Sequence, residues 1–286
     1  MVWEPALIKF SEQIIEKGYY HWEHSFQDFK KQFTITANQR APTYLSLDFY
    51  CRQRPELTNR GWYVIRLGQG NFGIFDEAKY AKPYLDLPID GSEEIQLRKI
   101  NSHRSLRKSF KSLDLTLKSA ENTLLELARF YNIFETMVNE IDGASNFHVG
   151  PRGGMTQQFP LCFKKQDSSL LSLEYDGQVE LDYSIWTENR VFVIEAKSLT
   201  RQGRDIGWHK MAFPTQRFIN EVHEEDLKIN PVYFLRTRVG RSNVLMLYVF
   251  DEMEFHKGGI ILNDENRWKL LKVFSVNIDQ LDEHLR

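Results

Sequence analysis

The feature that most constrains the fold is the segment from Gly177 to Ser198, in which apolar and polar residues alternate. Residues 179–186 alternate, and residues 190–196 are rich in β-branched and aromatic side chains, so both stretches predict β-strands. A tight turn at Glu188 and Asn189 is expected between them because Asn tolerates a positive φ. The segment is therefore predicted to form a β-hairpin.

The turn determines which residues of the hairpin face each other. It sets Asp182 opposite Glu195. It also sets Glu180 opposite Lys197, and since directly opposed residues share a face, all four charged side chains lie together. A slip of one residue would bury these charges, which favours this register. The other face is apolar and is expected in the core: Val179, Leu181, Tyr183, Ile185, Phe192, Ile194 and Ala196.

Asp182 and Glu195 repel each other when directly opposed, and a cation between them turns the repulsion into a binding site. Carboxylate oxygens suit hard divalent ions, above all Mg²⁺, for which Mn²⁺ can substitute. Lys197 would then lie beside the metal, where its ammonium can hold a water, stabilise phosphate charge or act in proton transfer. The alternative is a surface hairpin with solvated charges and an ion pair between Glu180 and Lys197. Four charges on one face favour the metal site.

Asp182, twelve intervening residues and then Glu195-Ala196-Lys197 resemble the D…ExK signature of the PD-(D/E)xK, or restriction-endonuclease-like, nuclease superfamily. Glu180 supplies the E-x-D variant found in many members, whereas Leu181 stands where the family pattern has Pro. The resemblance implies a metal-dependent phosphodiesterase. In such an enzyme Asp182, Glu195 and the Ala196 carbonyl would ligate Mg²⁺, and Lys197 would position or activate the water.

The composition is that of an ordinary globular protein. The 286 residues can bury a sizeable core and allow one large domain or two. Cys51 and Cys162 give neither a disulfide framework nor a CxxC metal site, so a cytoplasmic location is expected. No apolar run approaches about 20 residues and no signal-peptide pattern is present, so no membrane partner is expected. Because the net charge is −2, a nucleic-acid partner must be argued from local charge.

The N-terminal region, residues 1–112, is expected to be an α+β unit for DNA recognition. Apolar residues at helical spacing predict a helix that stops at Gly18 and a second helix over residues 25–33. Residues 61–76 predict two strands joined by a glycine-rich turn.

This turn contains Gly68, Gly70 and Gly73 in the spacing of the dinucleotide fingerprint. That fingerprint requires a helix to follow, and the pattern continues as a strand, so a plain hairpin is favoured over a nucleotide site. Such a hairpin suggests the wing of a winged-helix-like DNA-binding unit, with Arg66 and Gln69 near its tip.

A distinctly basic segment runs from Arg98 to Lys118, with Asp114 as its only acid. Basic runs are commonly solvated helix faces, and they are also the charge pattern expected for phosphate contacts. Beside a nuclease motif, DNA contact is expected for four of these residues: Arg104, Arg107, Lys108 and Lys111. The boundary with a nuclease domain, residues 113–286, is placed here.

Apolar residues recur at steps of three and four from Leu113 to Ile141, which predicts one long amphipathic helix that ends at Gly143. In the superfamily that the chain resembles, a helix before the sheet often adds an acid to the metal site. The candidates, among which the sequence does not choose, are Glu126, Glu135 and Glu140.

Residues 143–158 predict a polar, glycine-rich loop. It is either a plain connector or a phosphate-binding loop in which Arg152 reaches a base or phosphate. Two short strands are expected next, at residues 159–164 and 170–175, ahead of the charged hairpin.

After the hairpin, Pro214 suits the first turn of a helix that carries Gln216, a residue type found near the site in many superfamily members. Strands follow at residues 232–239 and 244–251, and Arg236 and Arg238 alternate to one side near their turn, where DNA contact is expected. The order of elements over residues 113–251 matches the αβββαβ core, with a mixed central sheet, of the α/β fold that the resemblance implies. Three residues of the tail are expected to pack back on it: Trp268, Leu271 and Phe274.

The sequence therefore predicts a Mg²⁺-dependent endonuclease that hydrolyses double-stranded DNA, most like a type II restriction endonuclease. A homodimer is expected by analogy, because such enzymes cut both strands of a symmetric site. A repair or structure-selective nuclease is the alternative with the same chemistry. A non-catalytic nucleic-acid-binding protein on the same fold is the alternative from another class, and the intact Asp182, Glu195 and Lys197 argue against it.

Overall fold

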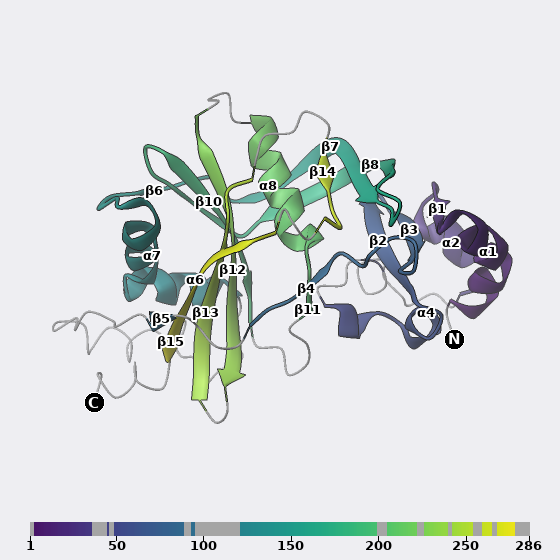
Figure 1. Ribbon diagram of the computed structural model, residues 1–286, viewed down its shortest axis with the longest axis horizontal. Helices are drawn as coiled ribbons and strands as arrows, with labels where there is room; N and C mark the ends of the chain where they lie inside the picture. The colour runs from purple at the N-terminus through teal and green to yellow at the C-terminus, as the bar shows by residue number, and fades with distance from the viewer. Residues whose placement is uncertain are drawn as a thin grey trace.

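The computed structural model describes residues 3–35, 45, 49–88, 93–94, 121–198, 205–221, 226–239, 242–253, 259–264 and 268–277. These residues form a mixed α/β structure built mainly from β-sheet (Figure 1). A small α+β unit lies at one end, a long β-hairpin lies in the middle, and a large sheet lies at the other end. None of the helices in these ranges has the length and apolar character needed to cross a bilayer.

The N-terminal unit packs two helices on a three-stranded sheet, and both helices confirm the prediction. α1 (Glu4–Lys17) ends at Gly18, whose φ of 86° is a left-handed conformation that suits glycine. α2 (Phe26–Gln32) begins after Ser25, whose hydroxyl accepts a hydrogen bond from the Asp28 amide. The remaining elements of the unit are β1 (Tyr19–Trp22), η1 (Tyr50–Arg52), α4 (Pro55–Thr58), β2 (Trp62–Gly68) and β3 (Asn71–Asp76), with sheet order β1-β3-β2.

The glycine-tipped hairpin is confirmed as β2 and β3, but its tip does not project. A Cβ on Gly68 would lie 1.8 Å from the carbonyl oxygen of Asp176 in β8 (Leu170–Leu181). Gln69 Nε2 also donates to Asp176 Oδ2 over 2.6 Å. The tip is therefore packed against the central hairpin, unlike the projecting wing that we expected.

The central hairpin joins the N-terminal unit to the large sheet. β7 (Gly153–Lys164) pairs with β8, and β6 (His148–Val149) pairs with β9 (Tyr183–Trp186). Both ladders keep one register, with three residues between them on each strand, and the chain passes between two sheets at Asp182. Half of the predicted loop at residues 143–158 is strand, at 148–149 and 153–158, since a hairpin with one solvated face accommodates polar residues.

A seven-stranded mixed sheet makes up the other end of the described structure. Its order is β5-β15-β13-β12-β10-β9-β6. β10 (Arg190–Lys197) is antiparallel to β9 and parallel to β12 (Lys228–Val239). The β9–β10 hairpin has the predicted register, with Tyr183 opposite Ile194. The other strands are β5 (Glu93–Glu94), β13 (Ser242–Phe250) and β15 (Leu270–Asn277), while β14 (Ile260–Ile261) joins β7 and β8.

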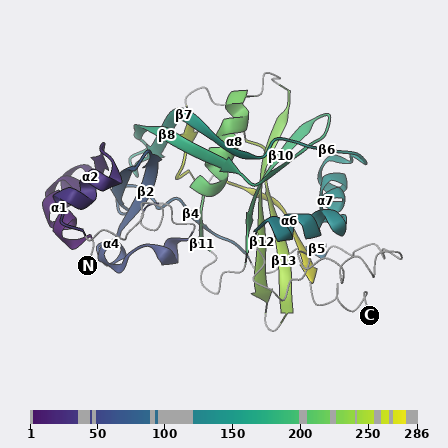
Figure 2. The same cartoon turned by 180° about the vertical axis from the view of Figure 1, so that it is seen from behind.

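Helices cover both faces of this sheet, as Figures 1 and 2 show from opposite sides. α6 (Glu121–Phe130) and α7 (Ile133–Asp142) pack on one face, and α8 (His209–Glu221) packs on the other. The α6–α7 side buries five residues of the predicted apolar face: Tyr183, Ile185, Phe192, Ile194 and Ala196. Val179 and Leu181 are buried as expected but not on this side, because the change of sheet at Asp182 places Leu181 with Phe218 of α8 and Val179 in a third cluster with Phe159.

Three predictions for helices and the tail are corrected by the structure. The single helix ending at Gly143 is two helices, since Asn132 between them adopts a left-handed φ of 56°. α8 starts at His209, so Pro214 lies inside it, where a proline costs one backbone hydrogen bond without excluding the helix. Leu271 of β15 is exposed to solvent, whereas Trp268 and Phe274 are buried as expected.

The N-terminal unit and the large sheet share one hydrophobic core. The rings of Phe75 in β3 and Phe163 in β7 stack with centroids 4.3 Å apart, and the same cluster extends to Tyr233 in β12. A two-stranded pairing of β4 (Tyr84–Asp86) with β11 (Asp205–Gly207) adds a second connection. The predicted boundary at residue 112 lies outside the described residues, and the structure on its two sides is packed together.

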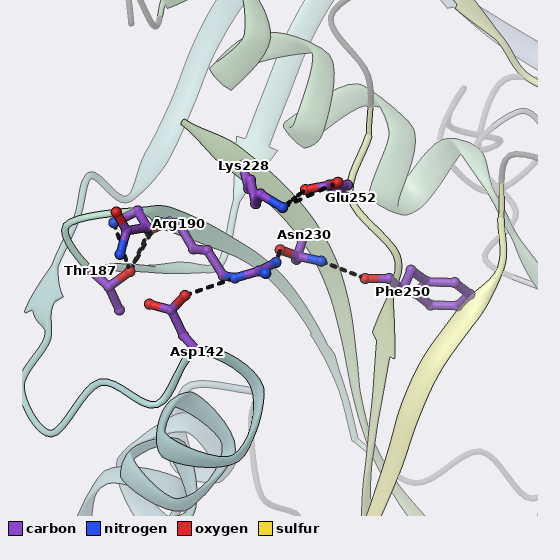
Figure 3. Close-up of polar contacts among 8 residues, drawn as sticks. Asp142, Thr187, Arg190, Lys228, Asn230, Phe250 and Glu252 are labelled. Atoms are coloured by element: carbon purple, nitrogen blue, oxygen red, sulfur yellow. Dashed lines mark hydrogen bonds and ion pairs between the residues drawn. The ribbon is translucent and has the colours of Figure 1, made fainter. Parts of the chain in front are cut away.

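The N-terminal end of β10 is held by a polar network (Figure 3). Arg190 donates from Nε to Asp142 Oδ1 over 2.8 Å and from Nη1 to Asn230 Oδ1 over 2.9 Å. Asn230 Nδ2 in turn donates to the Phe250 carbonyl over 2.9 Å. Because these bonds tie the end of α7 to β10, β12 and β13, they fix the strand that carries Glu195 and Lys197 relative to its neighbours.

Candidate active site

The two predicted metal-binding acids meet where the β9–β10 ladder stops. The last pair of that ladder is Tyr183 with Ile194. One residue further, Asp182 Oδ2 accepts a hydrogen bond from the Ala196 amide over 2.9 Å. The carboxylate of Asp182 thus takes the place of a backbone acceptor and is held beside the strand segment that carries Glu195.

Glu195 is buried, with 8% of its surface exposed. Burial, together with the negative charge of Asp182, raises the pKa of its carboxyl group to about 8, against the opposing effect of Lys197 and Lys210. A carboxylate in this position is destabilised by both its surroundings and its neighbour. Such a position stabilises any cation that reaches it.

Lys197 is held between two carboxylates. Its Nζ lies 2.9 Å from Glu195 Oε1 and 3.1 Å from Glu121 Oε1. The lysine is mostly buried, and Glu121, the first residue of α6, is partly exposed. The ammonium is therefore fixed at the end of β10 with one acid on its buried side and the other nearer to solvent.

Glu121 is the residue of this group that the sequence did not single out, whereas Lys210 was expected as a basic residue near the site. Glu121 comes from the helix that precedes the sheet, and Lys210 comes from the first turn of α8, close enough to Glu195 to lower its pKa. A signal for Glu121 exists in the sequence, because it lies three residues before Leu124 and four before Leu125, both of which are buried. An acidic residue on the face of the helix that packs on the sheet predicts a positively charged partner on the sheet.

The residues present fit a hard divalent cation. Mg²⁺ commonly takes one or two carboxylates, with water and substrate phosphate completing its shell. Asp182 and Glu195 supply two carboxylates. The N–H and C=O of one strand residue project to the same side, so the Ala196 carbonyl points toward Asp182 as its amide does. Within the described ranges there is no group of three or more His, Cys, Asp or Glu side chains arranged for a metal, so the fit rests on these two acids and this carbonyl.

Of the two remaining predicted site residues, Glu180 is not brought to this place. Glu180 belongs to β8, where it pairs with Gly154 of β7 and is exposed, so the predicted pairing with Lys197 is wrong. The cause is the change of sheet at Asp182, which an alternating pattern does not reveal. Gln216 is buried in α8, where its Nε2 donates to Asn220 Oδ1 over 2.8 Å.

The three candidate acids of the preceding helix also lie elsewhere. Glu126 is an ion-pair partner of Arg129 at 3.9 Å, and Glu140 is a partner of Lys272 at 3.2 Å. Glu135 lines a cleft of about 600 Å³ together with Glu126 and Arg129. Burial raises the pKa of Glu135, and the charge of Arg129 opposes the shift. These acids occupy outward positions of α6 and α7, and Glu121 takes the place expected for one of them.

The predicted DNA-contacting residues fall into two groups. Arg236 and Arg238 lie on the part of β12 that extends past the pairing of Lys197 with Leu235, at the same end of the sheet as the acids. Arg152 is exposed beside β9, with its guanidinium 4.5 Å from the ring centroid of Tyr183. The basic residues Arg104, Arg107, Lys108 and Lys111 lie outside the described residues.

Comparison with known proteins identifies the family of the chain. No curated protein matches it in sequence. A family described as a domain of unknown function, DUF6997, matches residues 82–260, which is more than half of the 286 residues. The matched range contains Glu121, Asp182, Glu195 and Lys197, and it begins ahead of the predicted boundary at residue 112. The chain therefore belongs to the DUF6997 family.

Proposed function

We propose that this protein is a Mg²⁺-dependent endonuclease that hydrolyses phosphodiester bonds of double-stranded DNA. The observation that carries the proposal is one cluster: Asp182 is bonded to the Ala196 amide, Glu195 is buried beside it, and Lys197 lies 2.9 Å from Glu195. These are the side chains of the D…ExK pattern, and they meet at one strand end.

The order of elements supports the same proposal. A helical layer, α6 and α7, precedes β8, β9 and β10, and α8 then leads to β12, which is parallel to β10. With β6, β7 and β11 as additional strands, this order resembles that of the αβββαβ core in the restriction-endonuclease-like superfamily. The similar order of elements is consistent with nuclease chemistry, but a fold alone does not establish an activity. The main support for the proposal is the set of residues at the site.

Asp182, Glu195 and the Ala196 carbonyl would hold Mg²⁺, which when bound neutralises charge on the phosphate and lowers the pKa of a bound water. Lys197 then places its ammonium, with its orientation set by Glu195 and Glu121, where it donates a hydrogen bond to the attacking water or to a phosphate oxygen. The water gives a proton to solvent as its oxygen bonds to phosphorus, the bond from phosphorus to the leaving sugar oxygen breaks, and that oxygen takes up a proton from solvent. Lys210 adds a second positive charge on the α8 side.

The chemistry of the surroundings suits a polyanionic substrate. Arg236, Arg238 and Arg152 lie at the same end of the sheet as the acids or next to Asp182. Phosphate contacts of this kind give affinity and register without reading sequence. We expect two copies of the chain to bind one DNA site as a homodimer, because each chain carries one such cluster and one cluster cuts one strand.

Incubation of supercoiled plasmid with the purified protein and Mg²⁺ tests the proposal. Discrete fragments would mean a sequence-specific restriction enzyme, and a smear would mean a less selective nuclease such as a repair enzyme. Retention of the plasmid without cutting, over a range of Mg²⁺ and Mn²⁺ concentrations, would mean that the protein binds DNA only and would overturn the proposed activity.

A further inference from the structure

An exposed arginine lies directly across from Asp182. Val149 pairs with Ile185 on one side of it and Gly153 pairs with Leu181 on the other. Three residues separate these pairs on both strands, so Arg152 and Asp182 occupy opposite positions. The constant register of the central hairpin therefore sets this arginine beside the proposed metal site, although it lies 30 positions before Asp182 in the sequence.

The backbone that carries Arg152 is held against β9. The Gly150 amide donates to the Ser184 carbonyl over 3.0 Å, and Ser184 Oγ donates to the Pro151 carbonyl over 3.0 Å. A Cβ on Gly150 would lie 2.1 Å from Trp186 Nε1, so only glycine permits this close approach. These contacts fix the position of the next residue but one, which is Arg152.

The side chain of Arg152 is also oriented. Its guanidinium carbon lies 4.5 Å from the ring centroid of Tyr183, within the range of a cation–π contact. The Tyr183 ring is fully buried and stacks on Phe134 of α7, with centroids 5.4 Å apart and an interplanar angle of 21°. The arginine thus rests on a rigid aromatic support, and less rotamer freedom remains to be lost when it binds a ligand.

The guanidinium of Arg152 forms no ion pair within the described part of the chain. Its guanidinium contacts the Tyr183 ring, and no carboxylate among the described residues pairs with it. Other arginines differ: Arg190 pairs with Asp142 at 2.8 Å, and Arg217 pairs with Glu221 at 3.0 Å. An oriented, exposed guanidinium without a counter-ion, beside an acid proposed to hold Mg²⁺, is suited to a ligand that carries negative charge.

We infer that Arg152 binds a phosphate of the nucleic-acid strand next to the phosphate that is cut. The inference rests on the proposed function and adds to it one binding residue with a defined partner. The planar fork of arginine matches two oxygens of one phosphate. Because Arg152 lies across from Asp182, it would position the nucleic-acid strand relative to the metal site without contacting the reacting atoms.

The test measures binding of a double-stranded oligonucleotide with Ca²⁺ in place of Mg²⁺, at KCl concentrations from about 50 to 200 mM. Arg152→Ala should weaken binding roughly tenfold at low salt and reduce the slope of log K against log [salt] by about 1. Arg152→Lys should keep the slope and recover part of the affinity, since it keeps the charge and loses the fork. Arg129→Ala is the matched control, an exposed arginine on α6 beside Glu126, and should behave as wild type.

A second readout separates binding of a neighbouring phosphate from catalysis. Bis(4-nitrophenyl) phosphate contains a single phosphate, so Arg152→Ala should hydrolyse it at the wild-type rate while its cutting of DNA is reduced. A wild-type salt slope and affinity in Arg152→Ala would overturn the inference and leave the proposed function standing. Loss of activity on the small diester as well would also overturn it. A wild-type protein that neither binds nor cuts DNA would overturn both proposals.

Discussion

Lys197 is the residue with the most constrained environment in the candidate site. Its ammonium lies 2.9 Å from one carboxylate and 3.1 Å from another, and the two acids come from different elements. Glu195 is two residues away on the same strand, whereas Glu121 lies on α6. An ammonium held from two sides keeps one orientation, and we expect that orientation to matter for the rate.

Glu121→Gln should therefore lower the rate of DNA cutting by roughly 10- to 100-fold, because the orienting charge is lost while the lysine remains. Binding of DNA and the melting temperature should change little, since Glu121 is partly exposed. Glu126→Gln on the same helix is the control and should cut as wild type. Equal rates in both variants would show that Glu121 has no part in positioning Lys197.

Metal binding has a readout that does not depend on activity. At a Mg²⁺ concentration ten times its Kd, the folded protein gains about 1.4 kcal/mol. That gain corresponds to a rise in Tm of roughly 2–3 °C for a chain of this size. Asp182→Asn should abolish the rise, and in EDTA it should melt no lower than wild type, because it removes a charge that repels Glu195.

Glu180→Gln is the control for this measurement, because its side chain is exposed on another sheet. It should show the full Mg²⁺-dependent rise, measured by differential scanning fluorimetry. A rise of the same size in Asp182→Asn would contradict the assignment of Asp182 as a ligand.

The local sequence pattern was sufficient to predict that Asp182, Glu195 and Lys197 come together, and insufficient to predict the third acid, Glu121. The alternation around Asp182 and Glu195 specifies one register, and the β9–β10 hairpin has it. Glu180 was assigned to the same face because alternation says nothing of a change of sheet. Glu121 was passed over because its contact with Lys197 depends on where α6 packs, although its spacing from buried Leu124 was visible.

At the scale of elements, the central hairpin and the helices show features of the fold that hydrophobic periodicity does not predict. β6–β7 and β8–β9 run in one register through two sheets. The strands from residue 159 onward were predictable, whereas β6, the start of β7 and the assignment of strands to sheets were not. Apolar residues continue at helical spacing through Asn132, yet its left-handed conformation divides one expected helix into α6 and α7. Hydrophobic spacing records which residues are buried, while a single backbone angle decides the direction of the next element.

The contact between the N-terminal unit and the central hairpin gives a prediction at this scale. Gly68 has a φ of 98° and lies so close to β8 that a Cβ would overlap the Asp176 carbonyl oxygen. Gly68→Ala should lower the free energy of unfolding by roughly 3 kcal/mol or more, since it adds a backbone clash to the strain of a positive φ.

Gly143→Ala is the matched control, because Gly143 has a φ of 67° with open space around it. It should cost only about 1 kcal/mol, the penalty for the backbone conformation alone. Urea unfolding of both variants measures the difference. Equal losses would mean that the packing of β2 and β3 against β8 is not tight in solution.

For the whole molecule, the packing argues against two independent domains. β2 and β3 are buried on both faces, with Trp62 and Val64 toward the N-terminal helices and Tyr63 and Ile65 in the core shared with the large sheet. The match of the family from residue 82 also begins before the boundary that composition suggested. The predicted boundary rested on a change in charge along the sequence, and a shift in surface composition need not interrupt a core.

The six tryptophans provide a test of this shared core. Three lie in the N-terminal unit and three lie in the remainder of the chain: Trp3, Trp22 and Trp62, then Trp186, Trp208 and Trp268. With 5-fluorotryptophan incorporated, all native ¹⁹F signals should disappear at the same urea concentration, as expected of one cooperative unit. Earlier loss of the first three signals would show that the N-terminal unit folds separately.

The most direct test of the central claim is the initial rate of plasmid cutting in Mg²⁺ by wild type and three alanine variants. Asp182→Ala and Lys197→Ala should each lose roughly 10³-fold or more in rate while still binding DNA. Glu180→Ala, which lies in the same sequence pattern but on the other sheet, should cut within about twofold of wild type, since distant exposed positions contribute little. Wild-type rates in Asp182→Ala or Lys197→Ala, or no cutting by the wild-type protein, would contradict the account.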